Sequence, residues 1–312
     1  MNDLQKLFSD FITSSGFSGK LTLDEKLSKH STFKIGGTTE IFYEPVLFDH
    51  LIKTLAFCRS NNIKFYVIGG GSNIVFPDET FHGVTITTTG ISAITKTQID
   101  EHRMLVKCES GTTMAAFVQF CTDNELSGAE QFAGLPGTIG GALYMNARCF
   151  EKSISELFKS ARYLDLDDFT LNEHGYMDQD WDYKVSPFQN SSKIIGNATF
   201  ELSIEKGKKA QIADACKIFI GERVSKGHFK YPSAGSVFRN NHSFGAPCGK
   251  LIDECGLKGT TIGGAQIAPF HGNFIINTGN ATAKDVKDLV NLAVNTVREK
   301  KGFSLVPEII FL

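Results

Sequence analysis

Several features that mark other protein classes are scarce or missing in this chain of 312 residues. It has a single tryptophan, and nowhere do about 18 apolar residues run uninterrupted, as a membrane-spanning helix would require. Its start, Met-Asn-Asp-Leu-Gln-Lys, lacks the basic and apolar regions of a signal peptide. We therefore expect a cytoplasmic protein that is not inserted in a membrane.

A surplus of charge of one sign is also missing. Lys plus Arg number 32 and Asp plus Glu number 34, and the net charge of -2 gives no electrostatic reason to bind a nucleic acid. The seven cysteines are spread along the chain and never form a Cys-x-x-Cys pair, so neither a disulfide scaffold nor a zinc site is expected. The sequence therefore predicts no nucleic-acid partner and no metal, and it leaves the oligomeric state open.

The apolar residues alternate between helical and strand spacing, which predicts an α+β chain. Thr282 and Asp285 form a capping box that predicts the start of a helix. The run Ile63–Ile68 predicts a buried strand that leads directly into glycines. Helical spacing predicts further helices over residues 3–13, 47–55, 114–121 and 209–224.

These elements predict three domains. We place them at residues 1–82, 83–225 and 226–307, and we expect residues 308–312 to form a strand that returns to the first.

Two glycine-rich segments are candidate ligand sites, because glycine lets the main chain approach a ligand closely. The first is Gly69-Gly70-Gly71-Ser72-Asn73, which offers main-chain N–H groups and two polar side chains to a pyrophosphate, although an ordinary turn explains it equally well. The second, Gly134–Gly141, holds four glycines and Pro136 in eight residues. So much constraint on a loop favours contact with a flat ligand over a simple change of direction.

Two common nucleotide motifs are excluded. The dinucleotide fingerprint would need a glycine at position 74, which is Ile74. A phosphate-binding P-loop would need Ser or Thr after Gly249-Lys250, where Leu251 stands. A third segment, Pro232–Asn241, combines small residues with polar ones, and by itself it fits a serine-capped turn as well as a substrate site.

Together the motifs resemble the UDP-N-acetylenolpyruvoylglucosamine reductase family. The resemblance covers residues 30–310 and rests on five segments in order: the Gly-Gly-Gly-Ser-Asn junction, GLPGTIGGALYMNA, PSAGSVFRN, Gly264–Gln266 with His271–Asn277, and Leu305–Glu308. It implies an FAD-binding fold of the vanillyl-alcohol-oxidase (PCMH) type in two subdomains, with a C-terminal α+β substrate domain. The short segment between Tyr183 and Ser236 resembles the branch of the family that lacks an extra substrate loop.

The resemblance also implies a reaction. NADPH reduces FAD, which then reduces the enolpyruvyl group of a UDP-sugar to UDP-N-acetylmuramate, a peptidoglycan precursor. It implies FAD contacts at Gly69, Gly70, Gly71, Ser72, Asn73, Gly134, Pro136, Gly137, Thr138, Gly140, Gly141 and Asn146. Because neither glycine segment holds a His or Cys, we expect FAD to be bound non-covalently.

Catalytic roles carry over from the family's motifs. Ser236 matches the serine that protonates the carbon beside the substrate carboxylate, and Glu308 matches the glutamate of the same proton-handling apparatus. Lys184 stands where the family usually has arginine, so a cation is kept while the planar fork of the guanidinium is lost. The resemblance further implies substrate contacts at Tyr183, Arg239 and Asn240.

Two other functions compete with this interpretation. An FAD-dependent alcohol oxidase of the same fold would explain both glycine segments but neither the AGSVF motif nor Glu308. A flavin- or nucleotide-sugar-binding protein without turnover is favoured only by the change to Lys184.

Overall fold

The computed structural model describes all residues, 1–312, and divides them into two compact units. Unit 1 comprises Met1–Leu23, Ile41–Gly70 and Gly83–Gly221. Unit 2 comprises Asp24–Glu40, Gly71–His82 and Glu222–Leu312. The three domains expected from the sequence, with their bounds, stay a prediction.

The first sheet of unit 1 has four strands in the order β1-β2-β5-β3. They are β1 (Gly19–Lys26), β2 (Thr38–Pro45), β3 (Phe65–Ile68) and β5 (Phe81–Thr87), and β3 runs parallel to β5. The helices α1 (Asp3–Ser15) and α2 (Phe48–Ser60) confirm two helices expected from apolar spacing. The predicted strand over residues 63–68 is shorter than expected, and only Ile68 of β3 is fully buried, because β3 forms the edge of its sheet.

Aromatic rings hold α1 and α2 together. Phe8 on α1 is fully buried, and the rings of Phe11 and Phe57 stack with their centroids 3.8 Å apart. The start of α1 is fixed by a capping box in which Asn2 and Gln5 exchange side-chain-to-main-chain hydrogen bonds. Packing therefore places both helices, whereas a side-chain cap fixes the start of α1 alone, since α2 begins after Leu47 without one.

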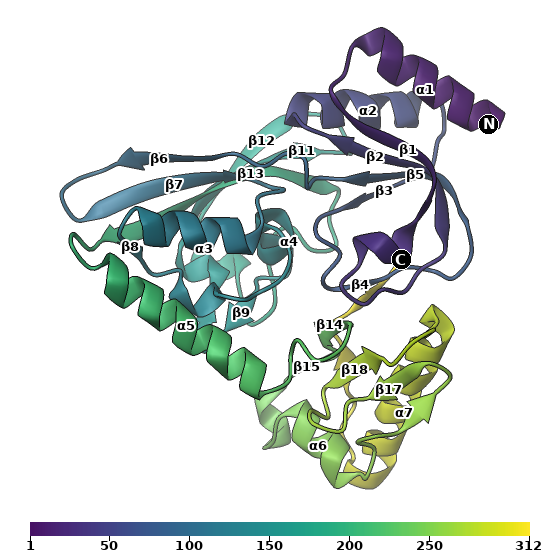
Figure 1. The fold of residues 1–312 in the computed structure, drawn as a ribbon, viewed down its shortest axis with the longest axis vertical. Helices are drawn as coiled ribbons and strands as arrows, with labels where there is room; N and C mark the ends of the chain where they lie inside the picture. Colours follow the sequence, from purple (N-terminus) through teal and green to yellow (C-terminus); the bar gives the residue numbers. More distant parts are fainter. The chain divides into compact units, whose positions relative to one another are not determined.

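The second sheet of unit 1 follows the order β12-β11-β13-β7-β6, and β8 also pairs with β13. Its strands are β6 (Ile94–Gln98), β7 (Arg103–Glu109), β8 (Leu126–Ser127), β11 (Phe158–Asp165), β12 (Leu171–Gly175) and β13 (Lys193–Ile204). The helices of this region are α3 (Met114–Asp123), α4 (Ile139–Tyr144) and α5 (Lys209–Ser225), and Figure 1 shows α3 and α4 over one face of the sheet. The helix α4, which carries the end of the second glycine segment, thus packs on β13 and β7 of this sheet.

Unit 2 is built around a sheet in the order β14-β18-β17-β16, which α7 covers. Its strands are β14 (Ser233–Ser236), β16 (Thr261–Ile262), β17 (Ala265–Ile267) and β18 (Phe274–Asn277), and its helices are α6 (Cys248–Glu254) and α7 (Ala283–Lys301). The capping box of Thr282 and Asp285 at the start of α7 is confirmed. The apolar face of α7 is buried at Val286, Leu289, Val290, Ala293 and Val297.

Two short strand pairs complete unit 2. In the first, β15 (Phe238–Arg239) runs antiparallel to β19 (Val306–Pro307). In the second, β20 (Ile310–Phe311) runs parallel to β4 (Ile74–Val75), directly after the first glycine segment. Segments that are far apart in the sequence therefore meet around residues 306–311.

The remaining elements are short. They are β9 (Arg148–Cys149), β10 (Lys152–Ser153) and the 3-10 helices η1 (Leu27–His30), η2 (Glu130–Phe132), η3 (Ile154–Glu156), η4 (Asp178–Asp180) and η5 (His242–Phe244). All seven cysteines are free and buried. None of the helices has both the length and the apolar character needed to cross a membrane.

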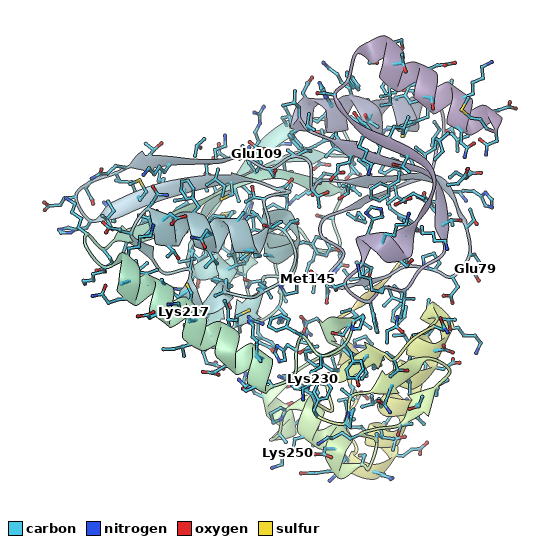
Figure 2. The ribbon with its side chains drawn as sticks, viewed as in Figure 1. Glu79, Glu109, Met145, Lys217, Lys230 and Lys250 are labelled. Atoms are coloured by element: carbon cyan, nitrogen blue, oxygen red, sulfur yellow. The ribbon has the colours of Figure 1, made fainter.

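Two half-buried histidines lie side by side in unit 2. The His228 ring stacks on Phe274 with centroids 4.9 Å apart, and its centroid lies 6.0 Å from that of His271. Burial lowers the pKa of His228 to about 4, and the positive charges of Arg223 and Lys226 act in the same direction. Burial also lowers the pKa of His271. Nearby, Lys230 lies over the Phe270 ring (Figure 2).

The free energy of unfolding should therefore fall as the pH drops from about 6.5 toward 4. In this window the folded state keeps His228 neutral while the unfolded chain binds a proton, since the ordinary histidine pKa is about 6.5. His228→Phe retains a ring on Phe274 and removes the titration. Urea unfolding at a series of pH values should show a shallower loss of stability below pH 6.5 for this variant, and equal slopes would contradict the assignment.

Candidate active site

The two glycine segments touch each other within unit 1. A Cβ atom on Gly69 would collide with the Thr138 hydroxyl, and one on Gly70 would lie 3.0 Å from the Cα atom of Gly137. A side chain at either position would therefore force a neighbour to move. Glycine at positions 69 and 70 thus permits close packing against the second glycine segment, and not only a turn.

The first glycine segment continues into unit 2 with Gly71, whose φ is +62° and whose Cβ would collide with the carbonyl oxygen of His30. Asn73 holds the segment by two hydrogen bonds. Its side-chain amide donates to the carbonyl of Glu308 at 3.1 Å, and its own carbonyl accepts from the N–H of Ile310 at 2.9 Å. Asn73, which the sequence predicts as an FAD contact, thus also fixes the main chain at Glu308.

The second glycine segment begins as a constrained loop and ends in a helix. Gly134 and Gly137 have φ of 75° and 106°, values that favour glycine. Thr138 then caps α4, with its hydroxyl accepting from the N–H of Gly141 at 3.4 Å. The expectation of a loop over all of Gly134–Gly141 is therefore wrong for its last residues, because the Thr138 hydroxyl starts a helix in spite of the low helix propensity of glycine.

A buried hydroxyl without a partner lies beside this segment. Ser110 is 1% exposed, and its Oγ atom has no hydrogen-bond partner in the structure. The Ser110 carbonyl accepts from the N–H of Gly140 at 2.8 Å, and a Cβ on Gly140 would lie 3.1 Å from the Cβ of Ser110. A buried polar group without a partner is costly. The Ser110 hydroxyl is therefore able to donate a hydrogen bond to a ligand that binds beside Gly140. The sequence analysis missed it, since a lone serine after a strand carries no signal.

Asn146 connects the end of α4 to the turn that carries Lys184. The chain leaves α4 through Met145 (Figure 2), and Asn146 itself is 2% exposed. Its side-chain amide donates to the carbonyl of Asp182 at 2.9 Å, and its side-chain oxygen accepts from the N–H of Ser155 at 3.3 Å. The predicted FAD contact at Asn146 stays a prediction, but the structure gives this side chain a supporting role for the turn.

Tyr183 and Lys184 occupy the tip of that turn. The turn is closed by a hydrogen bond from the N–H of Val185 to the carbonyl of Asp182 at 3.0 Å. Lys184 has φ of 60°, a left-handed conformation that costs a residue other than glycine about 1–3 kcal/mol. Gln189 donates its side-chain amide to the Lys184 carbonyl at 3.2 Å. The surrounding contacts thus hold Lys184 in a conformation that the isolated chain would avoid.

An aromatic cluster centred on Phe188 packs next to this turn. Phe188 is fully buried, and four rings lie with their centroids 5.7 to 6.5 Å from its own: Phe158, Tyr163, His174 and Trp181. Ser186 also donates its hydroxyl to the carbonyl of Tyr144, the last residue of α4, at 2.8 Å. The single tryptophan of the chain therefore serves to fix the segment that carries Lys184.

Ser236 and Glu308 are brought together in unit 2. Ser236 ends β14 after a bulge at Gly235, whose φ is 76° and whose missing Cβ would face open space. Ser236 is half-buried. The N–H of Glu308 donates to the carbonyl of Val237, the residue after Ser236, at 2.7 Å.

Arg239 and Asn240 follow in the same segment and contact the start of α6. The Asn240 side-chain oxygen accepts from the N–H of Cys248 at 2.9 Å, and the Cys248 thiol donates to the carbonyl of Arg239 at 3.3 Å. Burial raises the pKa of the Cys248 thiol, and the negative charge of Glu308 acts in the same direction. Arg239 is exposed, so its guanidinium is accessible to an anion.

Comparison with known proteins agrees with these features. Residues 40–168 match the family model described as "FAD binding domain", and residues 227–312 match "UDP-N-acetylenolpyruvoylglucosamine reductase, C-terminal domain". The chain is 43% identical to the UDP-N-acetylenolpyruvoylglucosamine reductase of Treponema denticola, over 94% of each protein. It is 37% identical to that of Borreliella burgdorferi, over 92% of this chain and 93% of the relative.

A solved structure is also similar. It is the UDP-N-acetylenolpyruvylglucosamine reductase of Thermus caldophilus, with a TM-score of 0.73 and 26% identity over 95% of this chain and 99% of that one. Fold and glycine segments define an FAD-dependent oxidoreductase, and the expected α+β FAD-binding fold is confirmed. Because close relatives match over nearly the whole chain, it belongs to the UDP-N-acetylenolpyruvoylglucosamine reductase family.

The residues present fit FAD. The contact between Gly70 and Gly137 leaves bare main chain on which a flat or anionic group can rest, and the Ser110 hydroxyl offers a donor that has no protein partner. Thr138, which caps α4, and Gly140 in the first turn of α4 lie next to these groups. We propose that these groups, with the other glycine-segment residues predicted from the sequence, hold the cofactor.

Gly69→Ala should weaken FAD binding. The added methyl group overlaps the Thr138 hydroxyl, and overpacking of about 1–3 kcal/mol corresponds to about 5- to 150-fold lower affinity. Flavin absorbance of the purified protein after dialysis measures the effect. Gly221→Ala in α5 is the matched control, because its Cβ would meet nothing within 4 Å, and it should keep its flavin. Full flavin retention by Gly69→Ala would show that the close approach is not needed for binding.

Proposed function

We propose that this protein uses NADPH to reduce UDP-N-acetylglucosamine enolpyruvate to UDP-N-acetylmuramate in peptidoglycan precursor synthesis. FAD, when bound, would supply the hydride transfer between NADPH and the substrate, which no side chain can provide. The observation that carries the proposal is the hydrogen bond from the N–H of Glu308 to the carbonyl of Val237, the residue after Ser236, in a chain of the reductase family. A cytoplasmic location, expected from the sequence, is part of the same proposal.

Ser236 acts as the proton donor to the carbon beside the substrate carboxylate. A serine hydroxyl is a weak acid, so it must be held at the reacting carbon to be effective. The bulge at Gly235 turns the end of β14, and Ser236 at that end is half-buried. This placement on a rigid strand end supports its role as the proton donor.

Glu308 assists Ser236 in handling the proton. Its main chain is held on both sides, since its N–H donates to Val237 and its carbonyl accepts from the Asn73 side chain. Two main-chain hydrogen bonds on one residue leave little freedom to the start of its side chain. The main chain from which the carboxylate extends is thus held next to the segment that bears Ser236.

Lys184 stabilises the charge on the substrate carboxylate as the intermediate forms. An ammonium group is a compact point charge, whereas the family's usual arginine offers a planar pair of donors. The hydrogen bonds from Asn146 and Gln189 hold the main chain of the left-handed turn from which the Lys184 side chain extends. Tyr183, Arg239 and Asn240 are proposed as substrate contacts, with Arg239 and Asn240 at the diphosphate and uridine ends.

Stopped-flow absorbance under anaerobic conditions separates this function from the alternatives. The proposal expects NADPH to bleach the flavin and the enolpyruvyl UDP-sugar to restore its colour. An alcohol oxidase would turn over alcohols without the UDP-sugar. A protein that only binds flavin would be bleached by NADPH and never recover with the UDP-sugar.

Lys184→Ala should slow the oxidative half-reaction by about 10- to 100-fold, the loss expected for one hydrogen bond to a charged group. Lys184→Arg should retain most of the rate, because the guanidinium keeps the charge and adds a second donor. Lys217→Ala, an exposed lysine on α5 (Figure 2), is the control. An unchanged oxidative rate in Lys184→Ala would remove Lys184 from the mechanism.

Ser236→Ala should slow the same half-reaction by about 10²- to 10⁴-fold, the usual contribution of general acid catalysis. The rate of flavin reduction by NADPH should not change, since the hydroxyl acts only on the second substrate. Both rates come from the same stopped-flow traces, and Ser225→Ala at the end of α5 serves as control. Equal losses in both half-reactions would indicate damage to the flavin site and not the loss of a proton donor.

A further inference from the structure

A buried asparagine clamps the segment that follows Ser236. Asn273 is 4% exposed and precedes β18. Its side-chain oxygen accepts from the N–H of Phe238 at 2.9 Å, and its side-chain amide donates to the carbonyl of the same residue at 2.8 Å. Its main-chain carbonyl accepts from the N–H of Val237 at 2.9 Å. One residue therefore makes three hydrogen bonds to the two residues after Ser236.

The clamped segment also carries Glu308. The Val237 carbonyl accepts from the N–H of Glu308, and Phe238 pairs with Pro307 across β15 and β19. Val237 is thus hydrogen-bonded through both of its main-chain groups: its N–H donates to Asn273, and its carbonyl accepts from Glu308. Any shift of this segment moves Ser236 and Glu308 relative to each other.

Asn273 is itself held in place. Its N–H donates to the Nδ1 atom of His271 at 3.2 Å. On the other side it is packed by α6, since a Cβ atom on Gly249 would lie 3.2 Å from the Asn273 nitrogen. Phe238 is 2% exposed, so the two main-chain groups that bind the Asn273 side chain have no access to water that could replace it.

We propose that Asn273 is a positioning residue of the reaction, which fixes Ser236 and Glu308 relative to each other through Val237 and Phe238. This inference rests on the proposed function of those two residues. It differs from a purely structural role, in which loss of Asn273 would lower the stability of unit 2 and leave the chemistry of the folded protein unchanged.

The chain supplies a matched control at the other end of β18. Asn277, the last residue of that strand, is 8% exposed, and its side chain makes four hydrogen bonds: it donates to the carbonyls of Phe33 and Lys34 and accepts from the N–H groups of Gly279 and Ala281. None of these partners belongs to the segment of Ser236 or of Glu308. Asn277→Ala therefore removes a similar buried network without touching the clamp.

The first test compares half-reactions per bound flavin. Asn273→Ala should slow the oxidative half-reaction with the enolpyruvyl UDP-sugar by about 10- to 100-fold, as expected when reacting groups are displaced by a fraction of an ångström to an ångström. The rate at which NADPH reduces the flavin of Asn273→Ala should stay within about twofold of the wild-type rate. Asn277→Ala should keep the wild-type rates of both flavin reduction and flavin reoxidation. Equal oxidative rates in Asn273→Ala and wild type, or equal losses in the two variants, would overturn the proposal.

A second variant covers the case in which Asn273→Ala does not fold. Asn273→Asp keeps the acceptor for the Phe238 N–H, and its carboxyl can donate to the Phe238 carbonyl only when protonated. Its oxidative rate relative to wild type should therefore rise as the pH falls. A ratio that does not change with pH would contradict the clamp, because a merely structural role would affect stability and not this ratio.

Amide hydrogen exchange separates a failure of this inference from a failure of the proposed function. In Asn273→Ala, or in Asn273→Asp at neutral pH, peptides covering residues 237–239 and 306–309 should both exchange faster than in wild type and in Asn277→Ala. Unchanged exchange at 306–309 would overturn the coupling. If the wild-type flavin is not reoxidised by the UDP-sugar, the proposed function fails, and the exchange result still decides whether Asn273 couples the two segments.

Discussion

The hydrogen bond from the N–H of Glu308 to the carbonyl of Val237, 2.7 Å long, is the contact on which the candidate active site of unit 2 depends. Next to it, Asn73 binds the Glu308 carbonyl, and β20 pairs with β4. A glycine segment, the strand that bears Ser236 and residues 306–311 are thereby joined within a few residues. Main-chain groups, whose positions are less variable than those of long side chains, do most of this joining.

The sequence predicted much of the fold, because many of its signals are local. The capping box of Thr282 and Asp285 and the apolar face of α7 are complete within one helix, and the structure confirms both. The strand before Gly69 was placed correctly, but it covers only Phe65–Ile68 and is less buried than expected. The burial of a strand depends on which strands lie beside it, and β3 lies at the edge of its sheet. The helix at Gly140 was missed because glycine composition outweighed the capping hydroxyl of Thr138.

Side-chain partners in the candidate site could not be predicted. Asn73, Asn146 and Asn240 were interpreted as ligand contacts, and in the structure the side chain of each one binds a main-chain group of another segment, only eight residues away for Asn240 and much farther along the chain for the other two. An asparagine has both donors and acceptors, so its partner is decided by tertiary neighbours that no motif encodes. The same holds for the Ser110 hydroxyl and for the ring cluster around Phe188, whose members come from several elements.

The division of unit 2 among three stretches of chain has a consequence for biosynthesis. Asp24–Glu40 and Gly71–His82 leave the ribosome early, whereas their partners belong to Glu222–Leu312. Unit 1 is also divided among three stretches, but all of them are complete once Gly221 has been made. Contacts of long sequence separation are slow to form, so strand β4 has to wait for β20 with its edge unpaired. Until residues 310–311 have been synthesised, β4 therefore has no strand to pair with.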